Sequence, residues 1–150
     1  MHLLFGTGVS AMTAYTSTLE MRTTGRGTHD ITQEVVRVVN GAGVRAGLCH
    51  VFARHTSAGI IITENADPTV RADLERLLAH LAPDGWPAFR HRAEGDDDMS
   101  AHVRTLLVGE GVQVPVQSGT LALGTWQGIF LWEHRTGSHQ REVVVTVLGE

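Results

Sequence analysis

Residues 44–63 read VRAGLCHVFARHTSAGIIIT, and this stretch decides the fold class. Val44–Ala53 and Gly59–Thr63 are rich in apolar and β-branched residues, which predicts two strands joined by the polar tip Arg54–Ser57. Further strands are predicted at Tyr15–Arg22, Val112–Val116, Thr120–Leu123, Gly128–Trp132 and Glu142–Leu148. Many short strands separated by glycine turns favour a mostly antiparallel, two-layer β core.

Two clear helices interrupt these strands. Asp30 precedes a segment over Ile31–Val39 with valines at helical spacing. Asp67 and Pro68 are typical of a helix start, and an apolar stripe predicts that this helix runs to Leu81. A shorter helix is predicted at Ala101–Val108, after a long polar loop over residues 86–98. The pattern therefore predicts an α+β domain with two or three helices.

Composition narrows the classes of function. The 150 residues fit one domain, and the net charge of −4 without an arginine cluster argues against nucleic-acid binding. No apolar stretch reaches the length of a membrane span, and no secretory signal begins the chain, so a cytoplasmic location is expected. All 12 basic residues are arginine, which excludes Schiff-base chemistry and a lysine-bearing phosphate loop. The nine histidines are the feature that needs explanation.

Two segments combine histidine with other polar groups. His55 lies at the strand tip, where an imidazole could bind a metal or shuttle a proton, although the tip alone favours a simple turn histidine. His91, Glu94 and His102 surround the triplet Asp96–Asp98. Imidazoles suit zinc and carboxylates suit magnesium, whereas a solvated acidic loop is the alternative interpretation. A third segment, Gly124–Gly128, holds Trp126 and Gln127, which could stack on and bond to a planar ring or simply form a hairpin.

Several motifs, in this order, carry a resemblance to a known family. They are His55-Thr56-Ser57-Ala58, Glu64-Asn65-Ala66-Asp67-Pro68 with Asp73, His91, Glu94-Gly95, Asp97-Asp98-Met99, Ala101-His102, Gly124-Thr125-Trp126-Gln127-Gly128-Ile129, Glu133-His134-Arg135, Arg141 and Gly149-Glu150. They resemble the YjbQ-like family, whose members have been linked to thiamine-phosphate-synthase activity. The match begins near Tyr15, so residues 1–11 are expected to be a disordered N-terminal extension, residues 12–150 a single domain, and Met12 the true start.

The resemblance implies a β-sandwich-like fold, a homotrimer and one polar pocket near a subunit boundary. It implies a metal-binding set, which is expected to hold zinc or magnesium: His55, His91 and His102. These histidines would act in catalysis with Glu94 and Glu133. The remaining matched residues would bind the small-molecule substrate, expected to be phosphorylated: Asn65, Asp67, Asp73, Trp126, Gln127, His134 and Arg141.

The reaction implied is the joining of hydroxymethylpyrimidine diphosphate and thiazole phosphate with release of pyrophosphate. Two alternatives stay open. One is a metal-dependent hydrolase of another small metabolite, with three histidines around a zinc-like ion. The other is a non-catalytic, trimeric metabolite-binding module. Neither nucleic acid nor membrane is expected as a partner.

Overall fold

A computed structural model describes residues 11–150, so nearly all of the expected N-terminal extension lies outside the described part of the chain. Eight strands and three helices follow one another along it. In chain order they are β1 (Thr13–Arg22), β2 (Gly27–Asp30), α1 (Thr32–Ala42), β3 (Ala46–Ala53), β4 (Ala58–Glu64), α2 (Pro68–Leu81), α3 (Asp96–Val108), β5 (Gly111–Gln117), β6 (Thr120–Leu121), β7 (Gln127–Glu133) and β8 (Gln140–Gly149).

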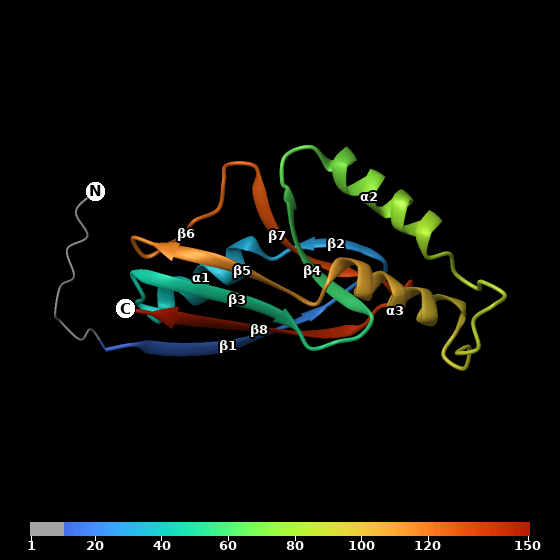
Figure 1. Cartoon of the computed structure of the whole chain (residues 1–150), viewed down its shortest axis with the longest axis horizontal. Helices are drawn as coiled ribbons and strands as arrows, with labels where there is room; N and C mark the ends of the chain where they lie inside the picture. The colour runs from blue at the N-terminus through green and yellow to red at the C-terminus, as the bar shows by residue number, and fades with distance from the viewer. Residues whose placement is uncertain (1–10) are drawn as a thin grey trace, which may run out of the picture.

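The strands form two antiparallel sheets (Figure 1). One has the order β1-β8-β3-β5-β6 and the other the order β2-β7-β4. In the larger sheet Cys49 lies opposite Val147 on one side and Val114 on the other, and all three side chains are buried. The core lies between the sheets, where these residues meet Ile129 and Leu131 of β7. The prediction of a mostly antiparallel α+β fold with two or three helices is confirmed.

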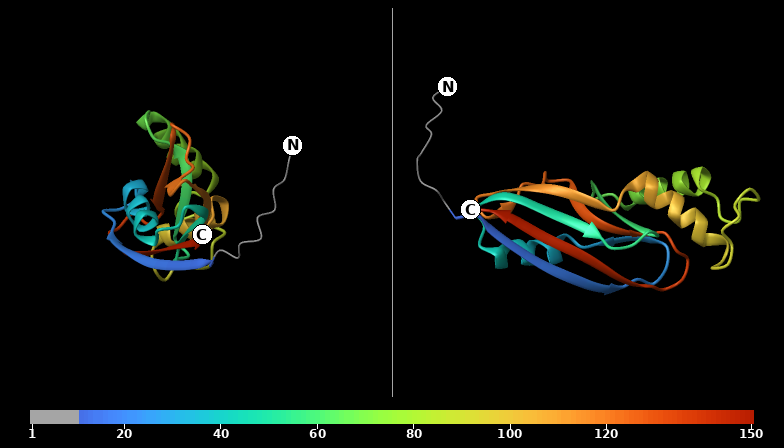
Figure 2. Two further views of the ribbon diagram at one scale, coloured as in Figure 1. Left: turned by 90° about the vertical axis from the view of Figure 1, so that its left-hand side faces the viewer. Right: turned by 60° about the horizontal axis from the view of Figure 1, so that its bottom comes forward.

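The helices have different relations to the sheets. Helix α1 packs beside the strands, whereas α2 and α3 lie together at one end of the molecule (Figure 2). Helix α2 has the predicted bounds, because Asp67 accepts a hydrogen bond from the Thr69 N–H and Pro68 opens the first turn. Its predicted apolar stripe is only partly covered, since Leu78 is buried while Leu77 and Leu81 are more than half exposed.

Helix α3 begins at Asp96, five residues before the predicted start. Gly95, at φ 108°, turns the chain into the helix, and Asp96, Asp97 and Asp98 occupy the first turn. Negative side chains are favourable there because the free N–H groups make that end of a helix positive. This earlier start places Asp98 one turn before His102, so the two side chains share a face. No helix among residues 11–150 is long and apolar enough to cross a membrane.

Candidate functional site

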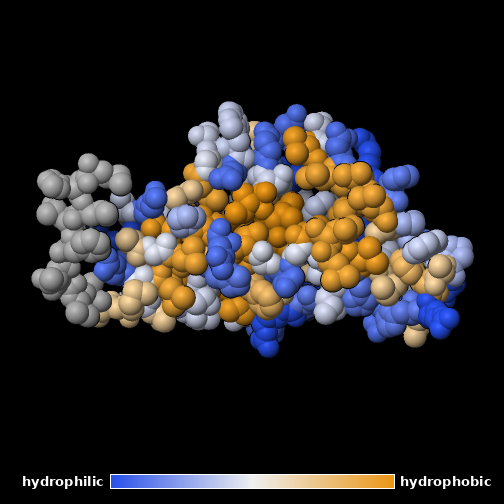
Figure 3. Space-filling model, in the orientation of Figure 1, coloured by the Kyte–Doolittle hydropathy of each residue, from blue (hydrophilic) through white to orange (hydrophobic). Residues whose placement is uncertain are grey.

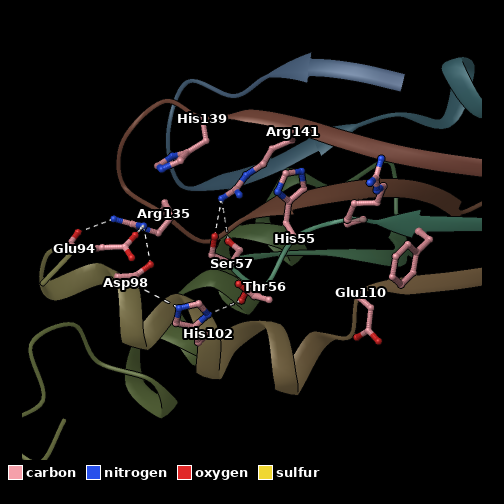
Figure 4. Close-up of a pocket in the computed structure, with 13 residues that line it drawn as sticks. His55, Thr56, Ser57, Glu94, Asp98, His102, Glu110, Arg135, His139 and Arg141 are labelled. Carbon is pink, nitrogen blue, oxygen red and sulfur yellow. Dashed lines mark hydrogen bonds and ion pairs between the residues drawn. The ribbon is translucent and has the colours of Figure 1, made fainter. Parts of the chain in front are cut away.

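A pocket of about 790 Å³ opens where the β3–β4 tip faces α3 and the start of β8 (Figure 4). Its lining is mostly polar and combines three elements that are distant in the sequence. The lining residues are Phe52, Ala53, Arg54, His55, Thr56, Ser57, Glu94, Asp98, His102, Glu110, Arg135, His139 and Arg141.

Asp98 and His102 of the pocket lining lie close to His91, and the ligand atoms of these three residues are within 4.8 Å of one another. The Oδ2 atom of Asp98 lies 2.7 Å from Nε2 of His91 and 3.4 Å from Nε2 of His102. Asp98 is buried, while both histidines reach solvent. A carboxylate and two imidazoles that converge in this way form a possible divalent-metal site.

The orientation of His102 is fixed from the β3–β4 tip. Its Nδ1 lies 2.9 Å from the Thr56 carbonyl oxygen, which can only accept, so Nδ1 carries the proton (Figure 4). In the neutral ring the proton on Nδ1 leaves Nε2 with its lone pair, and this lone pair faces Asp98. Metal-binding histidines are commonly held in this tautomer by such a backbone contact.

Arg135 fixes the other side of Asp98. Its Nη1 donates to Asp98 Oδ1 at 2.6 Å, and its Nε donates to Asp97 Oδ2 at 3.1 Å. Burial would raise the pKa of Asp97, but the Thr136 backbone N–H and the Arg135 guanidinium lower it to about 2. Asp97 thus stays ionised and anchors Arg135, which leaves Asp98 Oδ2 free to face the two histidines.

His55 lines the pocket but does not belong to this group. Its Nε2 accepts a hydrogen bond of 2.8 Å from the Glu142 backbone N–H, so the proton of the neutral ring lies on Nδ1. Burial and the nearby Arg141 lower the pKa of His55 and favour the neutral ring. The predicted set of three histidine ligands is therefore corrected: Asp98 takes the place of His55, because His55 has no ligand atom within the group that His91, Asp98 and His102 form.

Behind the pocket lies a buried ion pair between Arg141 and Glu133. Arg141 donates from Nε and Nη2 to the two carboxylate oxygens at 2.7 and 2.6 Å. Its Nη2 also donates to the hydroxyl of Ser57 at 3.0 Å. Burial would raise the pKa of Glu133, but hydrogen bonds from Arg141, Arg135 and Thr23 lower it. Of the predicted site residues, four line the pocket: His55, Glu94, His102 and Arg141. Glu133 supports Arg141 from behind.

His134 is fully buried and does not line the pocket. Neither ring nitrogen has a hydrogen-bond partner, and the ring packs against Trp132 at 5.6 Å between centroids. Burial and the nearby Arg104 lower its pKa to about 3, so the ring is neutral. Within one chain it cannot contact a ligand in the pocket.

The other five predicted substrate-binding residues lie at the far end of β4, on the adjoining loop and on α2. Within one chain they lie outside the pocket: Asn65, Asp67, Asp73, Trp126 and Gln127. The pocket adjoins the first residue of β4 and Asn65 follows its last, and a strand of seven residues spans about 20 Å. Asn65 Nδ2 donates to the Thr125 carbonyl and so braces the loop that carries Trp126. A single pocket that contains all the predicted residues is therefore not present in one chain.

Sequence comparison identifies relatives of this chain. The sequence model of the UPF0047 protein YjbQ-like family matches residues 17–150. The chain belongs to this family. A UPF0047 protein of Synechocystis is 50% identical to this YjbQ-like chain over 132 residues, covering 88% of this chain and 90% of the relative. The YjbQ protein of Salmonella typhimurium is 42% identical over 137 residues, covering 91% and 99%.

Solved structures show the same YjbQ-like fold. A YbjQ-like protein of unknown function from Sulfolobus solfataricus superposes with a TM-score of 0.87 at 28% identity, covering 93% of this chain and all of that one. A YjbQ/UPF0047 protein from Clostridium acetobutylicum gives a TM-score of 0.81 at 36% identity, covering 87% and 98%.

These relatives overturn the expected reaction. They carry only the UPF0047 or YjbQ-like name, and the Sulfolobus protein is described as of unknown function. The expectation of thiamine-phosphate synthesis, which rested on the resemblance alone, is therefore wrong. The three-histidine hydrolase that stood beside it also fails, because His55 lies outside the group of His91, Asp98 and His102.

Proposed function

We propose that this YjbQ-like protein is a metal-dependent enzyme that acts on a small molecule in the pocket beside α3. The observation that carries the proposal is the position of Asp98 Oδ2 between the Nε2 atoms of His91 and His102. A divalent ion bound there would polarise a substrate oxygen or activate a bound water.

The contact between His102 and Asp98 supports a cation in particular. His102 Nδ1 donates to the Thr56 carbonyl, so the neutral ring turns an unprotonated nitrogen toward a carboxylate oxygen 3.4 Å away. Two acceptors that face each other repel unless a proton or a metal ion lies between them. Arg135 keeps Asp98 in place and thus preserves this arrangement.

The ligand types favour zinc or another transition metal over magnesium. Two imidazoles and one carboxylate match the sets that hold catalytic zinc and non-haem iron, whereas magnesium prefers oxygen ligands alone. Three protein ligands leave positions open for water or substrate. The described surroundings of Asp98 thus fit a site for chemistry better than a closed structural site.

Cobalt substitution tests the site directly. Chelator-treated protein should bind one Co²⁺ per chain and develop visible absorption bands, which added Zn²⁺ should abolish. Asp98→Asn and His102→Ala should lose the bands. The matched controls Asp73→Asn and His80→Ala, at exposed positions on α2, should retain them. Equal spectra for Asp98→Asn and Asp73→Asn, or no bands in the unaltered protein, would refute the metal site.

We also propose that the protein assembles as a homotrimer, with α2, α3 and the edge of β4 in its interface. Figure 3 shows apolar residues gathered over these three elements. Leu77, Leu81, Leu106 and Leu107 are each more than half exposed. Strand β4 is the edge of its sheet, and within residues 11–150 the one backbone hydrogen bond on its outer side runs from the Ile60 N–H to the Gly109 carbonyl. An uncovered strand edge beside exposed leucines favours association with a second copy.

Light scattering coupled to size-exclusion chromatography tests this assembly. A trimer should have a mass of about 49 kDa, which is three times 16.2 kDa. Leu106→Glu should lower the mass because Leu106 is 85% exposed in one chain and a charge there harms only an interface. Thr120→Glu, at an exposed site on β6, is the control and should leave the mass unchanged. A mass near 16 kDa for the unaltered protein would contradict the proposal.

A further inference from the structure

We infer that the pocket contains a second subsite, formed by Arg141, Ser57 and His55, which binds the oxyanion end of a ligand, a phosphate or a carboxylate. This inference rests on the proposed function, because it names the chemical class of the molecule that the metal site would act on. Nothing in the names of the relatives assigns a ligand to these residues.

Only two of the three guanidinium nitrogens of Arg141 have hydrogen-bond partners among residues 11–150. Its Nε and Nη2 are bonded to Glu133 and Ser57. Its Nη1 has no hydrogen-bond partner among residues 11–150, and it is not among the buried unpaired nitrogens, so water or a ligand reaches it. The residue itself is 4% exposed and lines the pocket. The Nη1 nitrogen of a rigidly held cation is therefore accessible to a ligand.

Two further donors lie beside this guanidinium, as Figure 4 shows. The Ser57 hydroxyl accepts from Arg141 Nη2, which leaves its own hydrogen free to donate. The Nδ1 of His55 carries the proton because Nε2 accepts from the Glu142 N–H, and no described group accepts from Nδ1. Three donors of different types thus converge, each fixed by a contact on its opposite side.

Converging N–H and O–H donors select an acceptor-rich group. Phosphate and carboxylate oxygens fit this requirement, and an arginine binds both in a planar geometry. The pocket lining also contains Glu94 and Glu110; Arg135 lies 3.9 Å from Glu94, and Arg54 pairs with Glu142. Asp98 and His102, two of the three proposed metal ligands, line the same pocket as these donors, so we expect one small molecule to reach both. The ligand class is a small molecule with an oxyanion at one end and a metal-binding atom at the other.

The test is an NMR titration of the metal-free, ¹⁵N-labelled protein with inorganic phosphate and, separately, with acetate. We expect saturable shifts at the amides of His55, Ser57 and Arg141 with at least one of the two anions. Ser57→Ala should weaken that binding by about tenfold, because it removes one hydrogen bond to a charged group. Ser17→Ala, the same change at a half-buried site on β1, should leave it within twofold.

The two anions distinguish the sources of the oxyanion, since the tighter one identifies a phosphate or a carboxylate ligand. Three results would overturn the subsite: no saturable binding of either anion, equal affinity in Ser57→Ala and the unaltered protein, or binding that appears only after Zn²⁺ is added. Amide spectra of the free variants report whether each remains folded. The anion titration of the metal-free protein tests the subsite alone. Failure of the proposed metal site is detected in a separate experiment, as missing cobalt absorption bands.

Discussion

Arg141 and Glu133 form a two-point ion pair, at 2.6 and 2.7 Å, in which the carboxylate is fully buried. The pair joins β8 to the end of β7 and carries Ser57 of the β3–β4 tip. It is therefore both a structural link between the two sheets and the floor of the pocket.

Removal of one member of this ion pair should strongly destabilise the folded protein. Glu133→Ala leaves the Arg141 guanidinium buried without its counter-charge, and we expect a loss of about 3–5 kcal/mol in the free energy of unfolding. The control is Glu34→Ala, which breaks an exposed pair with Arg37 at 3.0 Å and should cost less than about 1 kcal/mol. Urea denaturation followed by circular dichroism measures both. Equal losses of free energy of unfolding in the two variants would show that the buried pair stabilises the fold no more than the exposed one.

The stability of the protein should fall as the pH drops below about 6.5, and His134 should account for much of the slope. Its pKa is lowered to about 3 in the folded chain, so the unfolded chain takes up a proton first as the pH falls. The loss should approach about 1.4 kcal/mol per pH unit until the folded pKa is reached. Lowered pKa values of Glu133 and Asp97 add their effect only at lower pH.

Denaturation between pH 6.5 and pH 5 separates this contribution. His134→Leu should reduce the pH dependence of the free energy of unfolding by the contribution of about one proton. This holds whatever the substitution does to the free energy of unfolding at a single pH. His80→Leu, at an exposed site on α2, should retain the full slope. An unchanged slope in His134→Leu would show that the buried ring does not control the acid response.

Zinc should raise the melting temperature through binding to the folded state. At a concentration 100 times the dissociation constant, the gain is about 2.7 kcal/mol, or several degrees for a domain of this size. Asp98→Asn should lose the shift, and Asp73→Asn should keep it. Differential scanning fluorimetry with and without chelator provides the measurement, and a shift of equal size in both variants would argue for unspecific binding.

The close approach of β3 and β8 at Gly47 should make this position intolerant of any side chain. A Cβ atom there would lie 2.0 Å from the Leu148 carbonyl oxygen, a backbone atom that cannot move without the strand. Gly47→Ala should lower the free energy of unfolding by about 1–3 kcal/mol or more. Gly137→Ala is the control, since its Cβ would meet nothing nearer than His139 Cε1 at 3.8 Å. Thermal unfolding of the two variants should differ clearly.

The sequence predicts most of the fold because its strands are strongly periodic and its second helix has a cap at Asp67. It fails where local signals conflict with tertiary pairing. No strand is predicted over residues 27–30, yet Gly27–Asp30 pairs with β7, a contact that no local pattern reveals. The start of α3 at Asp96 is not predicted, because the aspartate triplet, which suits the first turn of a helix, also suits a solvated loop.

The site is predicted less completely for the same reason. His91 and His102 were selected as ligands, but the role of Asp98 depends on a helix that begins at Asp96. The resemblance implies that Asn65 and Trp126 line one pocket with His55, whereas the strand pattern argues against this for Asn65. Residues 59–63 predict a strand, so the residues before and after it lie at opposite ends of that strand. The pairing of Arg141 with Glu133 depends on tertiary structure, and no sequence pattern contains it.

Of the histidines that line the pocket, His55 and His102 are both oriented by main-chain groups. The Glu142 amide holds one and the Thr56 carbonyl holds the other. Every amino acid supplies a carbonyl, and every one except proline supplies an amide, so exchange of the side chains at positions 56 and 142 leaves both tautomers intact. The orientation of the two imidazole rings is thus insensitive to substitution of the side chains at positions 56 and 142. A shift of the backbone at these positions would disturb it.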